Sequence, residues 1–141
     1  MIPARSVTRI VDALEDQEER IRAIRELVTA DELLQLAHYY NWDDGMQVPS
    51  AIVDHPACDL GVALQLFELA EGTVYLSEDR DWKHQEAWAS FCDELSTRIQ
   101  SGHYTSLTVH FESSLTAVQR FKLKKAGVPP IFFSSVTPTP I

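Results

Sequence analysis

The sequence has little of what several common functional classes require. It contains two cysteines, Cys58 and Cys92, and only 12 lysine and arginine residues against 21 aspartate and glutamate residues. Two cysteines in apolar helical contexts are typical of buried free thiols in a reducing compartment, although a disulfide between them stays an open alternative. The formal net charge of -9 argues against binding to a nucleic-acid backbone, which requires clustered cations.

Long hydrophobic runs are also absent. No apolar stretch approaches the roughly 20 residues that a helix needs to cross a bilayer. The first 20 residues have no apolar core ahead of their acidic residues, so they do not resemble a secretory signal. We therefore expect a cytoplasmic protein with neither a membrane nor a nucleic-acid partner. With 45% hydrophobic and 23% charged residues, the 141-residue chain has the composition of a single domain with an ordinary core.

Established catalytic and metal-binding motifs are missing too. The sequence has no Gly-rich phosphate loop, no G-x-S-x-G and no H-E-x-x-H. A calcium loop that starts at Asn41 fails, because Gly45 and Ile52 fall where oxygen ligands are required. His55 and Cys58 form one His-x-x-Cys pair, which supplies only half of a structural zinc site. The sequence therefore predicts no catalytic residue, no metal and no cofactor.

What the chain does have is helical periodicity along most of its length. Apolar residues recur at three-, four- and seven-residue steps, which is typical of helices with one buried face. The expected helices span residues 6–28, 30–40, 50–55, 60–70, 82–100 and 115–126. The first is expected to be one long, charged helix on the outside of a bundle. The fourth is apolar on most sides and is expected to be central.

Capping residues support several of these boundaries. Thr29 and Glu32 have the spacing of a capping box, and Asp59 is placed to cap the helix that begins at Leu60. Gly72 is expected to end that helix. Asp79 or Asp81 is expected to cap the next helix, and Ser113 or Ser114 the last one. Gly61, in a first helical turn, favours a close crossing with another helix.

Three segments favour extended structure instead. Residues 105–112 alternate apolar and polar side chains, and residues 73–77 and 131–136 are short and apolar. The predicted fold class is therefore mainly α: a single-domain bundle of about five to six helices with a small element of two or three β-strands. The expected domain spans residues 1–133, and residues 134–141 form a Pro/Thr-rich tail.

The segment N-W-D-D-G at residues 41–45 is the most distinctive in the chain. Adjacent aspartates before a glycine are typical of a tight turn. We expect Asn41, Asp43 and Asp44 to satisfy backbone groups, Gly45 to take a positive φ angle, and Trp42 to anchor the turn on the core. Further along, His55 and Cys58 are expected to pack the turn between two helices.

A family resemblance begins at the same residues. The segments "NWDDG", "P-x-x-I-V-x-H-P-x-C-D-L-G-x-A-L-x-L-F" and "F-K-L-K-K-A-G-V-P-P-I-F" resemble a bacterial domain family of unknown function over roughly residues 30 to 133. Proteins of this appearance are often immunity proteins of polymorphic toxins and of secretion-system effectors, including type VI secretion. The resemblance implies no established catalytic residue.

The leading hypothesis is a cytoplasmic immunity protein, not an enzyme, that binds a cognate protein toxin and occludes its active or cofactor site. An acidic surface favours a cationic partner through electrostatic steering. The predicted toxin-binding residues are Asp12, Glu15, Asp16, Glu19, Asp43, Asp44, Glu78, Asp79 and Asp81. Asn41, Trp42, Gly45, His55 and Asp59 have predicted structural roles.

Two alternatives remain. A helical adaptor or regulatory module would use an apolar groove, for example near residues 131–133. A small hydrolase would use His55 or Cys58 with the loop aspartates, which would have to converge in one pocket. Either a monomer or a homodimer is compatible with the sequence.

Overall fold

The computed structural model describes residues 3–138 and confirms a mainly helical fold. Within that range there are eight α-helices and no strand, so the expected count of about five to six helices is too low. The α-helices are α1 (Arg5–Thr8), α2 (Gln17–Arg25), α3 (Ala30–Tyr39), α4 (Gln47–Asp54), α5 (Leu60–Leu69), α6 (Gly72–Ser77), α7 (Glu86–Gln100) and α8 (Ala117–Lys125). A π-helical segment, η1 (Arg9–Ala13), continues α1, and two 3₁₀ segments are η2 (Trp42–Asp44) and η3 (Pro130–Phe133).

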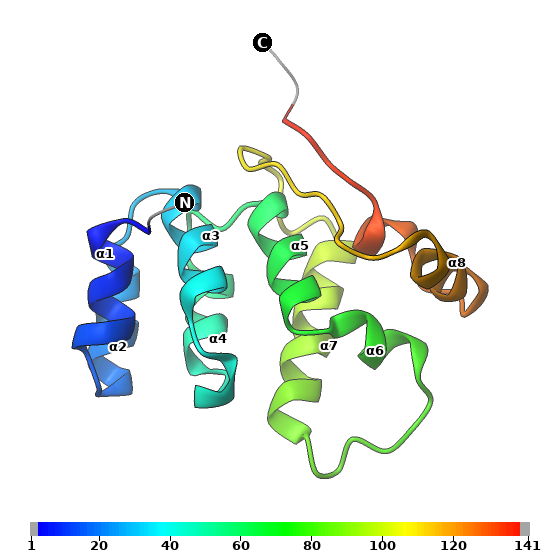
Figure 1. Ribbon diagram of the computed structural model, residues 1–141, viewed down its shortest axis with the longest axis horizontal. Coiled ribbons are helices and arrows are strands. Elements are labelled where there is room, and N and C mark those ends of the chain that lie inside the picture. The colour runs from blue at the N-terminus through cyan, green and yellow to red at the C-terminus, as the bar shows by residue number, and fades with distance from the viewer. Residues whose placement is uncertain (1–2, 139–141) are drawn as a thin grey trace.

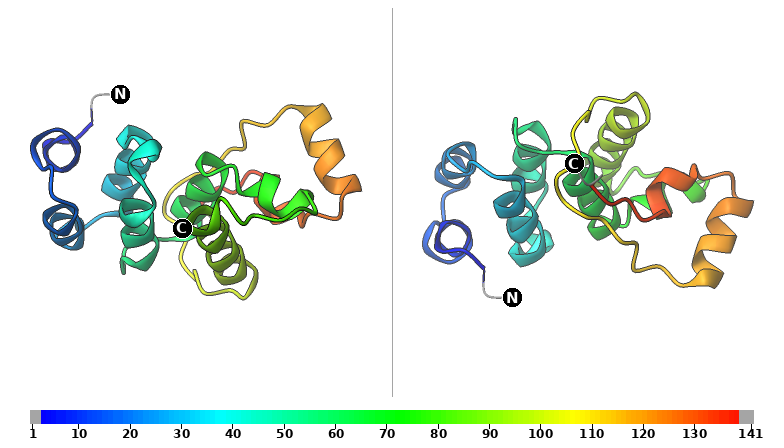
Figure 2. Two further views of the ribbon diagram at one scale, coloured as in Figure 1. Left: turned by 90° about the horizontal axis from the view of Figure 1, so that it is seen from below. Right: turned by 90° about the horizontal axis from the view of Figure 1, so that it is seen from above.

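The helices are arranged as antiparallel pairs standing side by side (Figure 1). The pair of α1–η1 and α2 is followed by α3 with α4 and then by α5 with α7. Helix α3 packs against both α1 and α5, while α2 packs against α4, so neighbouring pairs join in two layers. Figure 2 shows the same row from below and from above, with α8 at the end opposite to α1. Such a row exposes the turns between helices along its edges.

Helix α5 is the centre of the structure, as the sequence predicts. Six of its ten residues are buried, and it packs against α3, α6, α7 and η3. Phe67 stacks on Phe132 with ring centroids 4.6 Å apart. The apolar residues at 131–133 therefore belong largely to the core, because Phe132 and Phe133 are both buried.

The prediction of one helix over residues 6–28 is wrong. The chain turns at residues 14–16, where Leu14 has extended dihedral angles and Asp16 caps α2 by accepting a hydrogen bond from the Glu18 amide at 3.4 Å. Ile10 and Ile24 are both buried, one on each arm of the resulting hairpin. Apolar periodicity continues across the turn, and so it does not reveal the break.

The predicted β element shrinks to a single bridge. Residues 73–77 lie in α6, because Glu71 adopts a left-handed conformation and Gly72 begins a helix instead of ending one. Gly72 packs on Phe67 so closely that a Cβ there would lie 2.4 Å from the ring. Segments 105–112 and 131–136 meet at one antiparallel bridge, in which Phe111 and Val136 exchange two backbone hydrogen bonds.

Some predicted caps are confirmed and others are wrong. Thr29 and Glu32 form the predicted capping box. The caps predicted for the last two long helices are misplaced: α7 begins at Glu86 without a side-chain cap, and α8 begins after Thr116, which forms a capping box with Gln119. In the predicted tail, Val136 joins the bridge and Thr137 contacts His110, whereas residues 139–141 lie outside the described range.

Asp59 joins α5 to the long segment that precedes α8. Its carboxylate is 3% exposed and accepts hydrogen bonds from the Val62 amide at 2.9 Å and from the Thr108 amide and hydroxyl at 2.7 and 2.6 Å. The Val109 amide donates a fourth at 3.1 Å. Gly61 allows this approach, since a Cβ there would lie 2.0 Å from the Val109 carbonyl oxygen. The close contact at Gly61 is therefore with a loop and not with another helix.

Replacing Asp59 by alanine is expected to destabilise the fold by about 3 kcal/mol, because four donors, the buried Val62 amide among them, lose their acceptor. The free energy of unfolding, measured in urea, checks this value. Asp79→Ala, at an exposed carboxylate, is the control and should change stability by less than about 0.5 kcal/mol. Equal stability of the two variants would contradict the structural role of Asp59.

Candidate functional site

Three turns meet at one edge of the helical row (Figure 1). The first turn (residues 14–16) joins η1 to α2, the second (residues 41–45) joins α3 to α4, and the third (residues 78–85) joins α6 to α7. Because the helices alternate in direction, all three turns come to the lower edge in Figure 1. Segments that are far apart in the sequence thus form one continuous surface.

The predicted toxin-binding residues are on these turns or within a few residues of them. All nine carboxylate side chains are exposed. We call this surface the acidic edge; it consists of Asp12, Glu15, Asp16, Glu19, Asp43, Asp44, Glu78, Asp79 and Asp81. The structure therefore brings together three acidic groups that the sequence presents separately.

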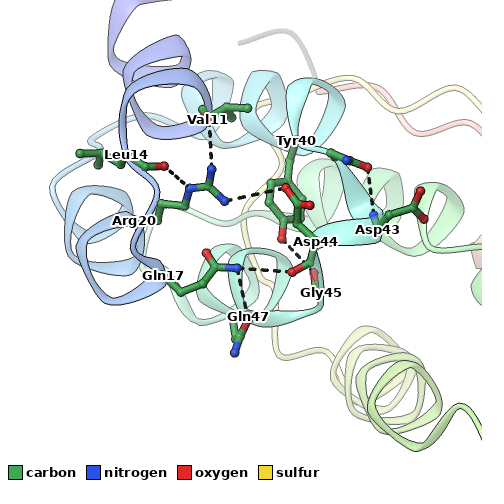
Figure 3. A network of polar contacts seen from close by, with 10 residues as sticks. Val11, Leu14, Gln17, Arg20, Tyr40, Asp43, Asp44, Gly45 and Gln47 are labelled. Carbon is green, nitrogen blue, oxygen red and sulfur yellow. Dashed lines mark hydrogen bonds and ion pairs between the residues drawn. The ribbon is translucent and has the colours of Figure 1, made fainter.

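Arg20 joins the first turn to the second (Figure 3). Its side chain is 12% exposed, donates to the carbonyls of Leu14 at 2.6 Å and Val11 at 3.1 Å, and lies 3.9 Å from the Asp44 carboxylate. Gln17 donates to the Asp44 carbonyl at 3.4 Å. One arginine thus satisfies carbonyls at the end of η1 and holds the second turn beside it. Sequence reasoning missed Arg20 because it looks like one more charge on a long helix.

The second turn has most of the predicted geometry. Asn41 accepts a hydrogen bond from the Asp43 amide at 3.1 Å, Trp42 donates to the Ala37 carbonyl at 2.9 Å, and Gly45 has a φ angle of 110°. The expectation for the two aspartates is wrong. Among the described residues, neither carboxylate accepts a hydrogen bond from the backbone. The Asp43 carboxylate therefore keeps its oxygens available at the surface, whereas the exposed Asp44 carboxylate lies beside Arg20.

A depression of about 500 Å³ lies between the second and third turns. All three tryptophans of the protein, Trp42, Trp82 and Trp88, line it together with Asp43 and Arg80. Trp82 and Trp88 pack edge to face with centroids 5.0 Å apart, and the Arg80 guanidinium lies 4.7 Å from the centre of the Trp82 ring. We call this hollow the tryptophan depression. Aromatic rings beside carboxylates can receive cationic or aromatic side chains.

A larger groove of about 960 Å³ runs over α4, between α2 and α7. Its lining mixes apolar side chains such as Ile21 and Phe91 with charged ones such as Arg25 and Glu94. Arg98 reinforces one wall through ion pairs with Asp54 at 2.9 Å and Glu94 at 2.7 Å. Residue spacing does not indicate this groove, because its walls come from three separate helices.

His55 is held in a structural role between two helices. Its Nδ1 accepts a hydrogen bond from the Ala57 amide at 2.9 Å, and its Nε2 lies 2.7 Å from the Leu27 carbonyl oxygen. A carbonyl can only accept, so Nε2 carries the proton and both ring nitrogens are engaged. Cys58 is buried, and burial raises the pKa of its thiol to about 12. This arrangement gives no support to a nucleophile–base pair at these positions.

Residues 3–138 contain no cluster of three or more histidine, cysteine or acidic side chains placed to hold a metal ion. In the same range, no helix is both long enough and apolar enough to cross a membrane.

The two thiols should react very slowly with a thiol-specific reagent in the folded protein. Burial raises the pKa of Cys92 to about 12 as well, and so at neutral pH almost no thiolate is present at either cysteine. Absorbance after addition of a disulfide reagent should show no fast phase, and two thiols per chain should appear once denaturant is added. A fast native phase from Cys58 would contradict the structure.

Arg20→Met should loosen the first turn without unfolding the helical row. The carbonyls of Val11 and Leu14 lose their donor, and Asp44 loses its ion pair. Hydrogen exchange should accelerate at least about tenfold over residues 3–16, while the amides of α5 keep their protection. Arg22→Met, at an exposed position on the same helix, is the matched control and should leave exchange unchanged.

Comparison with known proteins adds one finding. A family model described as "Domain of unknown function (DUF4274)" matches residues 28–100, which is just over half of the chain and includes both the second and the third turn. Neither the curated proteins nor the solved structures contain a match.

Proposed function

The chain belongs to the DUF4274 family of domains of unknown function, and from that premise and the geometry of its acidic edge we propose that it is an immunity protein. In this proposal the protein works in the cytoplasm without a cofactor and without enzymatic activity. It binds a cognate antibacterial toxin, such as an effector of a secretion system, and occludes the toxin's active or cofactor site.

One observation supports this proposal above all: nine exposed carboxylates from three turns share one edge with an aromatic depression. Exposed carboxylates attract a basic surface over about 8 Å at physiological salt and speed its approach. Tryptophan is enriched where binding energy concentrates, since it combines a large apolar area with a polar group. The edge thus offers both long-range attraction and a place for short-range contact.

The partner that fits this edge is a protein with a basic, concave site. Toxins that act on nucleic acids or nucleotides carry such sites, because they must hold phosphates. Carboxylates presented on rigid turns can take the place of those phosphates. Arg20 and the hydrogen bonds of the second turn restrain this part of the edge before binding, which lowers the entropy lost on association.

The adaptor alternative is favoured by one feature, the groove over α4. Its size suits a helix or an extended peptide from a partner. Near residues 131–133, where the sequence predicts a groove, Phe132 is buried in the core, and a smaller depression of about 500 Å³ is lined by Phe133 together with Ala117 and Phe121 of α8.

The test is co-purification of the tagged full-length protein from its native cells, followed by identification of any stoichiometric partner. A partner that is toxic when expressed alone, and harmless when expressed with this protein, would support immunity. Asp43→Lys with Asp44→Lys, and separately Asp79→Lys with Asp81→Lys, should each weaken binding at least about tenfold, mainly by slowing association.

Two controls make this test specific. Glu26→Lys with Glu112→Lys changes the net charge equally at exposed positions away from the acidic edge, and it should leave affinity within about threefold. Ala51→Arg fills the groove over α4. If Ala51→Arg abolishes binding while the edge variants bind normally, the adaptor reading replaces immunity through the acidic edge.

A further inference from the structure

Helix α8 is unlike every other helix of nine or more residues in the described structure, because none of its residues is buried. Val118 and Phe121 are 63% and 66% exposed, one turn apart on the same face. Isolated helices shorter than about 12 residues are marginal in water, and packing of an apolar face normally stabilises them. The exposed pair therefore marks a surface that lacks a partner within the described chain.

The charge of α8 is also opposite to that of the rest of the protein. The helix carries Arg120, Lys122, Lys124 and Lys125, which are four of the 12 basic residues, and none of the 21 acidic ones. It lies outside the part of the chain that matches the family model. We call the combination of exposed Val118 and Phe121 with these four cations the basic arm.

The acidic edge has the complementary properties. It presents carboxylates, and between its second and third turns it contains a depression lined by three tryptophans. An inserted phenylalanine could pack against Trp82 or Trp88, while lysine or arginine side chains could pair with Asp43 or Asp79. Arg80 already stacks on Trp82 and pairs with the Glu78 carboxylate, so the incoming cations are left to Asp43 and Asp79.

The basic arm and the acidic edge of one molecule do not meet. Helix α8 projects from the end of the row beyond α5, whereas the three turns lie along the lower edge (Figures 1 and 2). The two complementary surfaces can therefore pair with each other only between two copies of the chain.

We propose that the basic arm of one copy docks on the acidic edge of another, with Phe121 in the tryptophan depression. This contact uses the edge assigned above to the toxin but requires no toxin. It would cover the acidic edge while the partner is absent, and a basic toxin would compete for the same carboxylates.

The experiment is sedimentation of the purified full-length protein from micromolar to near-millimolar concentration, at low salt and in about 0.5 M NaCl. We expect association at low salt with a dissociation constant that rises at least about tenfold in high salt, because exposed charges are screened. A protein that stays monomeric at every concentration in low salt would overturn the proposal.

Two variants, each with only one of the two surfaces altered, test the specific contact. The arm variant carries Phe121→Ser and Lys124→Glu, and the edge variant carries Asp43→Lys and Asp79→Lys. Each alone should associate about 30-fold more weakly than the wild type. An equimolar mixture should form a one-to-one complex, because the intact arm of one variant meets the intact edge of the other. Failure of the mixture to associate would overturn the pairing of these two surfaces.

A matched control removes one exposed apolar side chain and reverses one exposed cation elsewhere. Val28→Ser with Arg5→Glu does this, and it should associate like the wild type. Equal loss in this control would show that net charge alone drives association and would contradict the proposal. A membrane surface is the other possible partner of the basic arm, and pelleting with vesicles that contain phosphatidylserine tests it. Vesicle binding that depends on the arm, without self-association, would assign the arm to a membrane surface instead.

Discussion

The buried carboxylate of Asp59 is the interaction on which the rest of the structure depends. It caps the central helix α5 and at the same time accepts three hydrogen bonds from Thr108 and Val109, almost fifty residues later in the chain. The helices before α5 form a row through ordinary apolar packing. The segment after α7 has little regular structure, and this carboxylate together with the close approach at Gly61 fixes where it runs. Because that segment leads to α8, Asp59 also determines where the basic arm projects.

The row of antiparallel helices explains why carboxylates from distant turns share one edge. Each helix contributes one buried face to the core, so the side surfaces are used for packing, and the turns remain free to carry polar residues. Three of these turns carry aspartate and glutamate. Exposed carboxylates add little to folding stability, since solvent screens them, but their field extends beyond contact distance. Folding therefore does not require them at one edge, and the proposed binding role would give them a use there.

The acidic edge and the basic arm give the molecule one negatively charged surface and one positively charged surface. A uniformly acidic protein would be repelled by copies of itself, whereas this one carries a local positive surface with exposed apolar side chains. If both proposals hold, one set of carboxylates serves two occupants in turn, and binding of the toxin competes with self-association. The relative affinities then decide how much protein is available to neutralise a toxin, by simple mass action.

The sequence by itself determined the helical class, the centrality of α5, the capping box at Thr29 and the cap at Asp59, because these follow from local periodicity and from side chains close to the backbone groups they satisfy. It did not predict the break at residues 14–16 or the helix at Gly72, since periodicity continues through the first and the second is set by contact with Phe67. Only the tertiary structure brought three distant turns to one edge and left α8 uncovered. The direction of each helix and the packing between helices decide which turns lie close together, and neither is encoded in residue spacing.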